Sequence, residues 1–199
     1  MNRGRILLLA LTALLLALGL GFAATPGCSH HGGAVDDGTP AVDTEIMAFL
    51  SEARALHHQA NLAEDNGDLA GAIKAMDRLV TATRPHPERK TPEVEEVLAD
   101  AYARLAELRL KVGELDPAGA AVKNGLEHVA DATYFRGHLI EVQGLIEESR
   151  AAQLADAGRS DEAKQAGERA IQLFEEVVKI QDQVIRRSLA KDGGVEAAR

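Results

Sequence analysis

Apolar side chains recur every three or four residues along most of the chain, between about residues 44 and 190. This spacing places them on one face of an α-helix, whereas a half-buried strand alternates apolar and polar residues. No comparable alternating stretch interrupts the pattern. It therefore predicts an all-α domain over residues 44–190, with apolar stripes in six segments: 46–63, 69–80, 94–112, 118–129, 135–154 and 163–185.

Residues that favour helix ends stand between these stripes. Thr91 and Asp116 each precede a proline, which is favoured at the first helical position, so we expect both to cap the helices that follow. Asp68 and Ser160 are expected to cap two further helices. The segment 84–87 holds two prolines and cannot continue a helix.

Three glycines that follow the end of a stripe reveal an internal repeat. They are separated by 46 residues (67 to 113) and 45 residues (113 to 158), with alanine seven residues before and five residues after each. Small side chains let the two helices of a hairpin cross closely, and glycine tolerates the backbone conformation that ends a helix. We therefore predict three antiparallel helical hairpins with these packing residues: Ala60, Gly67, Ala72, Ala106, Gly113, Ala118, Ala151, Gly158 and Ala163.

The segment Gly67-Asp68-Leu69-Ala70-Gly71-Ala72-Ile73 resembles the turn and second-helix start of tetratricopeptide (TPR) repeats. Tyr102 matches the family's large aromatic position. The resemblance covers roughly residues 45–190, although the spacing exceeds the family's period of about 34 residues. It implies three stacked hairpins in a TPR-like α-solenoid, whose first helices line a concave face for a peptide or protein. The alternative is a generic bundle of α-hairpins.

The N-terminal 27 residues have the pattern of a secretory signal peptide. Arg3 and Arg5 precede the apolar run 6–24, and small residues follow it. Gly27-Cys28 resembles a lipoprotein cleavage site, which implies acylation of Cys28, with palmitate among its acyl chains. Thr25 and Pro26 depart from the usual pattern. The alternatives are an uncleaved anchor helix and cleavage after residue 23 or 24, which releases a soluble protein.

Cys28 is the only cysteine, so an internal disulfide is impossible. We expect a protein of the bacterial cell envelope, exported and membrane-anchored through lipid. Ser29 after the cysteine favours the outer membrane, with the domain facing the periplasm. Residues 28–43 are expected to be a flexible tether, and residues 191–199 a disordered tail.

The chain is acidic, with a formal net charge of −9. Residues 1–27 hold two basic and no acidic residues, so the remainder carries 20 basic against 31 acidic residues, or −11. A charge of this sign repels nucleic acid, so no nucleic-acid partner is expected. An acidic groove for a basic peptide is one use for such charge, and solubility is the other.

The sequence offers little for catalysis or metal binding. It has no Gly-x-Ser-x-Gly motif and no phosphate-binding glycine loop, so we expect neither an enzyme nor a cofactor. His57 and His58 are adjacent and point about 100° apart on a helix, which cannot form one metal site. His30 and His31 in the tether are the remaining candidates for metal binding, but we expect the chain to hold no metal site.

Two features suggest partners. Tyr134, Phe135 and Arg136 gather aromatic and guanidinium groups in an aromatic-poor chain, either to fill the junction between hairpins or to anchor a partner. The long last helix carries many apolar residues over 175–189, suited to folding back or to oligomerisation. The sequence therefore predicts a protein-interaction scaffold or adapter, with a self-associating envelope spacer as the alternative.

Overall fold

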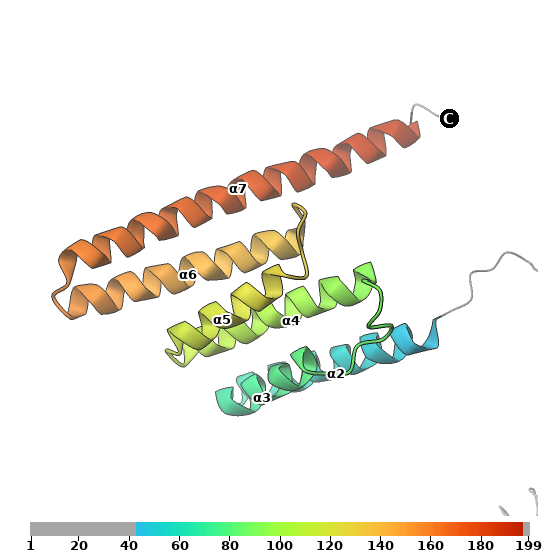
Figure 1. The fold of residues 1–199 in the computed structure, drawn as a ribbon, viewed down its shortest axis with the longest axis horizontal. Coiled ribbons are helices and arrows are strands. Elements are labelled where there is room, and N and C mark those ends of the chain that lie inside the picture. The colour runs from blue at the N-terminus through green and yellow to red at the C-terminus, as the bar shows by residue number, and fades with distance from the viewer. Residues whose placement is uncertain (1–42, 197–199) are drawn as a thin grey trace, which may run out of the picture. The chain divides into compact units, whose positions relative to one another are not determined.

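The computed structural model describes the backbone of residues 43–196 and the side chains of residues 43–190. Within this range the chain forms six α-helices and no strand, which confirms the all-α prediction (Figure 1). Among these helices none is apolar enough over a sufficient length to cross a membrane. The predicted signal peptide, Cys28 and the tether up to residue 42 lie outside the described residues. The helices are α2 (Thr44–Asp65), α3 (Leu69–Val80), α4 (Pro92–Lys111), α5 (Leu115–Leu126), α6 (Tyr134–Asp156) and α7 (Ser160–Glu196).

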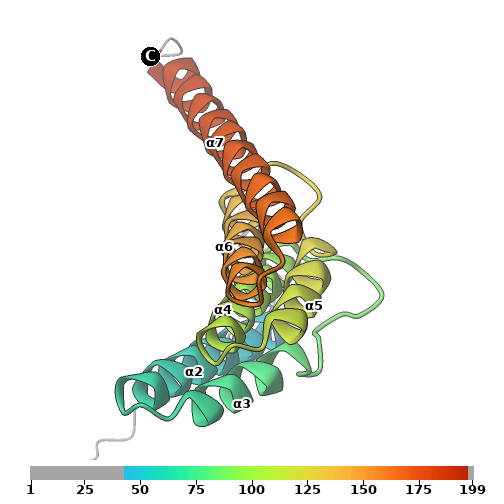
Figure 2. The ribbon, with the colours of Figure 1, turned by 90° about the vertical axis from the view of Figure 1, so that its left-hand side faces the viewer.

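Consecutive helices pack in pairs, α2 with α3, α4 with α5 and α6 with α7. Helix α4 also contacts α2, α3 and α6, and α5 contacts α6, so the pairs are joined in chain order. Figure 2 shows α2, α4 and α6 in succession, with α3 and α5 beside them on the other side. The first helices of the three pairs therefore lie next to one another.

The three corners within the pairs have the same backbone structure. Gly67, Gly113 and Gly158 have φ angles of +77°, +80° and +74°, a region that side chains with a Cβ atom rarely adopt. In each corner the N–H after the glycine donates to the carbonyl five residues earlier, at 2.8 Å for Asp68, 2.9 Å for Glu114 and 2.9 Å for Arg159. This bond is the signature of a Schellman ending. Equivalent positions in the sequence therefore make equivalent turns.

Two of the expected helix caps stand where the sequence placed them, but only one forms a side-chain bond. Asp68 accepts a hydrogen bond from the backbone N–H of Gly71 at 2.8 Å. Thr91 occupies the cap position of α4, with Pro92 as the first helical residue, yet its hydroxyl makes no capping bond. The fixed φ of proline is sufficient to set this helix start.

The expectations for Asp116 and Ser160 were wrong. Glu114 is the cap residue of α5, which puts Asp116 in the first turn, and Ser160 is the first residue of α7. The reason is that all three corners have the same structure. The residue after each glycine closes the turn, so the next helix begins with the second residue after the glycine. Helix α7 also continues to Glu196, past the limit of 190 expected for the domain.

Burial of the repeated alanines differs among the three pairs. Ala60, Ala72, Ala106 and Ala118 are fully buried, whereas Ala151 and Ala163 are partly exposed. In the first pair both α2 and α3 contact α4 of the second pair, whereas in the last pair α6 contacts the second pair and α7 contacts only α6. The hydrophobic core accordingly concentrates in α2 to α6, where its largest fully buried side chains are Met76, Leu79, Val94, Leu108, Val122, Leu139 and Val142.

Two glycines inside helices allow close packing that the sequence analysis did not identify. A Cβ atom on Gly125 in α5 would lie 2.6 Å from Cδ2 of Leu139 in α6 and 2.9 Å from Cβ of Tyr102 in α4. A Cβ atom on Gly144 in α6 would lie 2.7 Å from the ring of Phe174 in α7. Both distances are too short for real contacts, so hydrogen is the only side chain that fits without movement.

Candidate binding groove

Two adjoining hollows lie along the first helices of the pairs, and both are lined by Glu96 and Phe135. We call them together the groove. The hollow between α2, α4 and α6 has a volume of about 530 Å³ and is lined by Leu50, Ala53, Arg54, His57, Glu93, Glu96, Val97, Asp100 and Phe135. The second hollow, of about 650 Å³, reaches α7 and is lined by Glu96, Ala132, Thr133, Tyr134, Phe135, Val184, Arg187, Ser188 and Ala190.

Acidic residues of α4 form one wall of the groove because helix periodicity places them on the same face. Glu93, Glu96 and Asp100 are spaced by three and four residues, so they share one helix face with Val97. Glu93 and Glu96 are exposed and form no ion pair with any residue in the range 43–190. This part of the groove therefore combines apolar surface with the carboxylates of Glu93 and Glu96, and Arg54 is the one arginine or lysine among the described residues that lines the same hollow.

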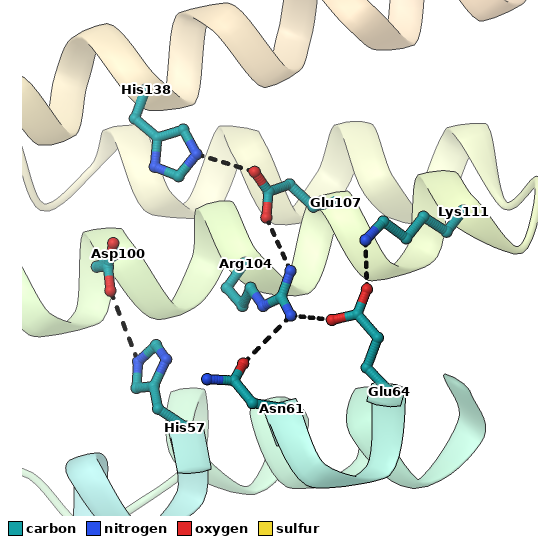
Figure 3. Close-up of polar contacts among 8 residues, drawn as sticks. All are labelled: His57, Asn61, Glu64, Asp100, Arg104, Glu107, Lys111 and His138. Carbon is teal, nitrogen blue, oxygen red and sulfur yellow. Dashed lines mark hydrogen bonds and ion pairs between the residues drawn. The ribbon is translucent and has the colours of Figure 1, made fainter. Parts of the chain in front are cut away.

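A series of polar contacts extends further along α4 and joins α4 to its neighbours α2 and α6 (Figure 3). On the α2 side, Nε2 of His57 lies 3.7 Å from Asp100, and Arg104 contacts Asn61 at 3.3 Å. Glu64 accepts hydrogen bonds from both Arg104 and Lys111. On the α6 side, Glu107 lies 3.0 Å from Nε2 of His138 and 3.2 Å from Arg104.

Burial and these contacts shift the pKa values of the two histidines in opposite directions and lower those of the two glutamates. Burial lowers the pKa of His57, although the Asp100 carboxylate opposes part of the shift. The hydrogen bond with Glu107 raises the pKa of His138. Burial alone would raise the pKa of Glu107, but the bonds from His138 and Arg104 outweigh it and the pKa is lowered. The bond from Lys111, followed by that from Arg104, lowers the pKa of Glu64.

The structure separates the three residues of the Tyr134-Phe135-Arg136 segment. Tyr134 is 58% exposed and lines the second hollow, and Phe135 packs against the core while lining both. Arg136 lines neither: it donates to the Val129 carbonyl at 3.2 Å and lies 3.8 Å from Glu176 of α7. The two aromatic residues are therefore available to a ligand in the groove, and Arg136 serves packing.

Sequence reasoning named the helices that carry the groove but missed most of its residues. Leu50 and Val97 belong to the predicted apolar stripes, and Val184 lies in the segment 175–189, for which folding back and oligomerisation were both expected uses. The available signal was the wide apolar face of these helices, which exceeds what one neighbour can cover.

A third hollow, of about 740 Å³, lies near the corners of the second and third pairs. Its charged residues largely satisfy one another: Arg150 contacts Asp116 and Glu147, and Arg159 contacts Glu162. It offers a ligand little free charge and little apolar surface, so the groove is the better candidate for binding.

Replacing His138 with glutamine is expected to lower the free energy of unfolding in a pH-dependent way. Because folding raises the pKa of His138, its contribution is complete below its ordinary value of 6.5 and is lost as the pH rises through the folded value. Because folding lowers the pKa of Glu107, that contribution is complete above 4.5 and is lost as the pH falls through the folded value. The pair is therefore most stabilising between these limits.

Urea unfolding of wild type and His138→Gln should differ by about 1 kcal/mol near pH 6 and by clearly less near pH 9. The exposed His58, replaced in the same way, is the matched control and should show no such difference. A His138→Gln effect of equal size at both pH values would contradict the assignment of this ion pair.

Within residues 43–190, no group of three histidine, cysteine, aspartate or glutamate side chains is placed to hold a metal ion. The metal hypothesis for His30 and His31 concerns positions outside the described residues. No protein-family model matches the chain, and no curated protein matches it either.

Proposed function

We propose that this chain is a lipid-anchored protein of the bacterial cell envelope whose helical domain is a scaffold for protein interaction. In this proposal the three helix pairs form a TPR-like stack, and the groove binds a peptide or protein segment. The observation that carries it is the convergence of α2, α4 and α6 on one apolar and acidic hollow. The aromatic residues Tyr134 and Phe135 provide the groups that dominate binding energy in protein interfaces.

Support for a repeat stack comes from the corners and from the packing between pairs. Three glycines with matching φ angles and matching hydrogen bonds make the pairs equivalent units. Gly125 brings the second pair close to the third, because it leaves room for Leu139. Stacking of equivalent units produces an extended surface on the side of the first helices.

The chemistry of the groove suggests the kind of segment that it binds. Glu93, Glu96 and Asp100 favour a ligand with basic side chains, while Leu50, Val97 and Phe135 favour apolar contacts. A segment that alternates basic and apolar side chains would match both the acidic and the apolar residues of the groove. The acidic character of the chain agrees with a basic partner and disfavours nucleic acid.

The proposed anchor depends on the leader and on Cys28. Acylation of that residue converts the only thiol of the chain into a membrane attachment, and residues 29–43 would link it to the domain. This arrangement would hold the groove near the membrane surface, within reach of other envelope proteins.

Photo-crosslinking in intact cells tests the proposal. A photoreactive phenylalanine analogue at Glu96 or Tyr134, both in the groove, is expected to give the same adduct. Exposed Lys74 of α3 and Lys123 of α5 are matched controls on second helices and should give none. The adduct should sediment with membranes, and Cys28→Ser should release it. Equal adducts at the control positions, or none from the groove, would refute the scaffold; a soluble adduct with Cys28 intact would refute the anchor.

A further inference from the structure

Helix α7 carries a row of exposed apolar side chains that no other described element covers. Ile171, Val178 and Ile185 are seven residues apart, and Leu189 follows one turn later; their exposed fractions are 60, 69, 57 and 67%. At about 100° per residue they lie within roughly 40° of one another on the helix. A repeat of seven is the spacing of a seam between two paired helices. We call this row the α7 seam.

The α7 seam is separate from the face that packs on α6. Ala166, Ala170 and Ile180 are the buried residues of α7, and they lie on a different side of the helix from the seam. The seam therefore remains exposed after the third helix pair has formed. Four apolar side chains in line on an exposed helix are typical of an interaction surface.

Charges along one edge of the seam alternate in sign. Glu175, Lys179, Asp182 and Arg186 are all exposed and lie on the same side of it. Asp182 and Arg186 already form an ion pair at 2.7 Å within the helix. The opposite edge carries Phe174, Gln181 and Ser188, which have no charge.

We propose that the α7 seam binds the α7 seam of a second copy of the chain, with the two helices antiparallel. The two-fold axis of this pair is perpendicular to the helices and crosses them midway between the levels of Ile180 and Gln181. Antiparallel pairing about this axis places Glu175 level with Arg186 of the second copy, and Lys179 level with Asp182. The same register sets Ile171 within one residue of Leu189 of the second copy in height, and Val178 within two residues of Ile185. One register thus matches both the apolar residues and the charges.

A parallel pair does not match the charges. In a parallel pair the two-fold axis runs parallel to the helices. It brings the charged edge of one copy against the uncharged edge of the other, so no ion pair forms. An anionic membrane surface also fits poorly, because Glu175 and Asp182 alternate with Lys179 and Arg186 along the seam, where such a surface favours lysine and arginine alone.

The fold leaves space for this pairing. Gly137, near the start of α6, lies against Ile180 and Gln181 of α7, so the axis falls near that end of α6. Among the described helices only α6 contacts α7, and α7 continues past the start of α6 (Figure 1). In an antiparallel pair the helical stacks therefore occupy opposite ends.

Cysteine crosslinking of the full chain in its native membranes tests the orientation. The double variant Ile171→Cys/Leu189→Cys is expected to form disulfide-linked dimers under mild oxidation. Each single variant should remain at the background of the wild-type chain, which retains Cys28. Dimers from Ile171→Cys alone would show parallel pairing and overturn the proposal. Adducts of another mass would show a different partner and overturn it as well.

Charge exchange tests the register. Reversing both acids, Glu175→Lys/Asp182→Lys, in the double-cysteine chain should reduce the dimer yield by about tenfold, since four cross-pairs become repulsive. Adding Lys179→Glu/Arg186→Glu restores complementarity and should restore the yield. Helical content measured by circular dichroism must stay unchanged in both. If the yield fails to fall in the first variant or fails to return in the second, the proposed register is wrong.

Discussion

Ala106→Leu is expected to lower the free energy of unfolding by about 3 kcal/mol or to prevent folding. Ala106 is fully buried in α4, at a position where the repeat requires a small side chain. Leucine is almost as good a helix former as alanine, so any loss comes from packing rather than from helix propensity. Three added carbon atoms have no space in a fully buried site and must push apart α4 and its neighbours.

The repeat supplies the matched control. Ala151 is the equivalent residue of the third pair and is partly exposed, so Ala151→Leu should change the free energy of unfolding by less than about 1 kcal/mol. Urea unfolding followed by circular dichroism measures both variants. Similar losses from the two variants would contradict the difference in packing between the second and third pairs.

Gly125→Ala is expected to destabilise the protein by about 1–3 kcal/mol, against the ordinary trend for glycine in a helix. Alanine normally gains up to about 1 kcal/mol over glycine in a helix interior. At this position the new methyl group would meet Leu139 and the Cβ atom of Tyr102. Leu139 is fully buried, and the Cβ atom of Tyr102 is attached directly to the backbone of α4, so relief of the clash requires a shift of packed side chains or of α4 itself. The clash therefore outweighs the gain.

Gly119 provides the control in the same helix. A Cβ atom there meets nothing within 4 Å, so Gly119→Ala should stabilise the protein by about 0.5–1 kcal/mol. Thermal and urea unfolding of the two variants should thus shift in opposite directions. Stabilisation by both would show that α5 is not packed against α6 as described.

The helices and their corners could be predicted because local interactions determine them. Each corner depends on one glycine and on hydrogen bonds that span five residues, so the sequence carries the whole signal. The caps were less predictable. Asp116-Pro117 resembles a helix start, but the corner at Gly113 had already fixed that start at Leu115.

The site was harder to predict because its contacts join residues that are distant in sequence. Glu107 and His138 are 31 residues apart, and Glu64 and Lys111 are 47 apart. Their encounter depends on how the pairs pack, which helical periodicity does not specify. The close approach at Gly125 has the same origin: its spacing places it on the apolar face of α5, but nothing in α5 shows that it meets Leu139 of α6 and Tyr102 of α4.

Nuclear Overhauser measurements on the folded chain test most directly whether successive helix pairs stack, on which the groove and the proposed function depend. The stacked arrangement predicts a strong contact between the Hα protons of Gly125 and the methyl groups of Leu139, which link the second pair to the third. It also predicts one between Gly144 and the ring of Phe174, within the third pair. Observation of both supports the stack. A Gly144 contact without the Gly125 contact would show that the pairs form but do not stack, and would contradict the account.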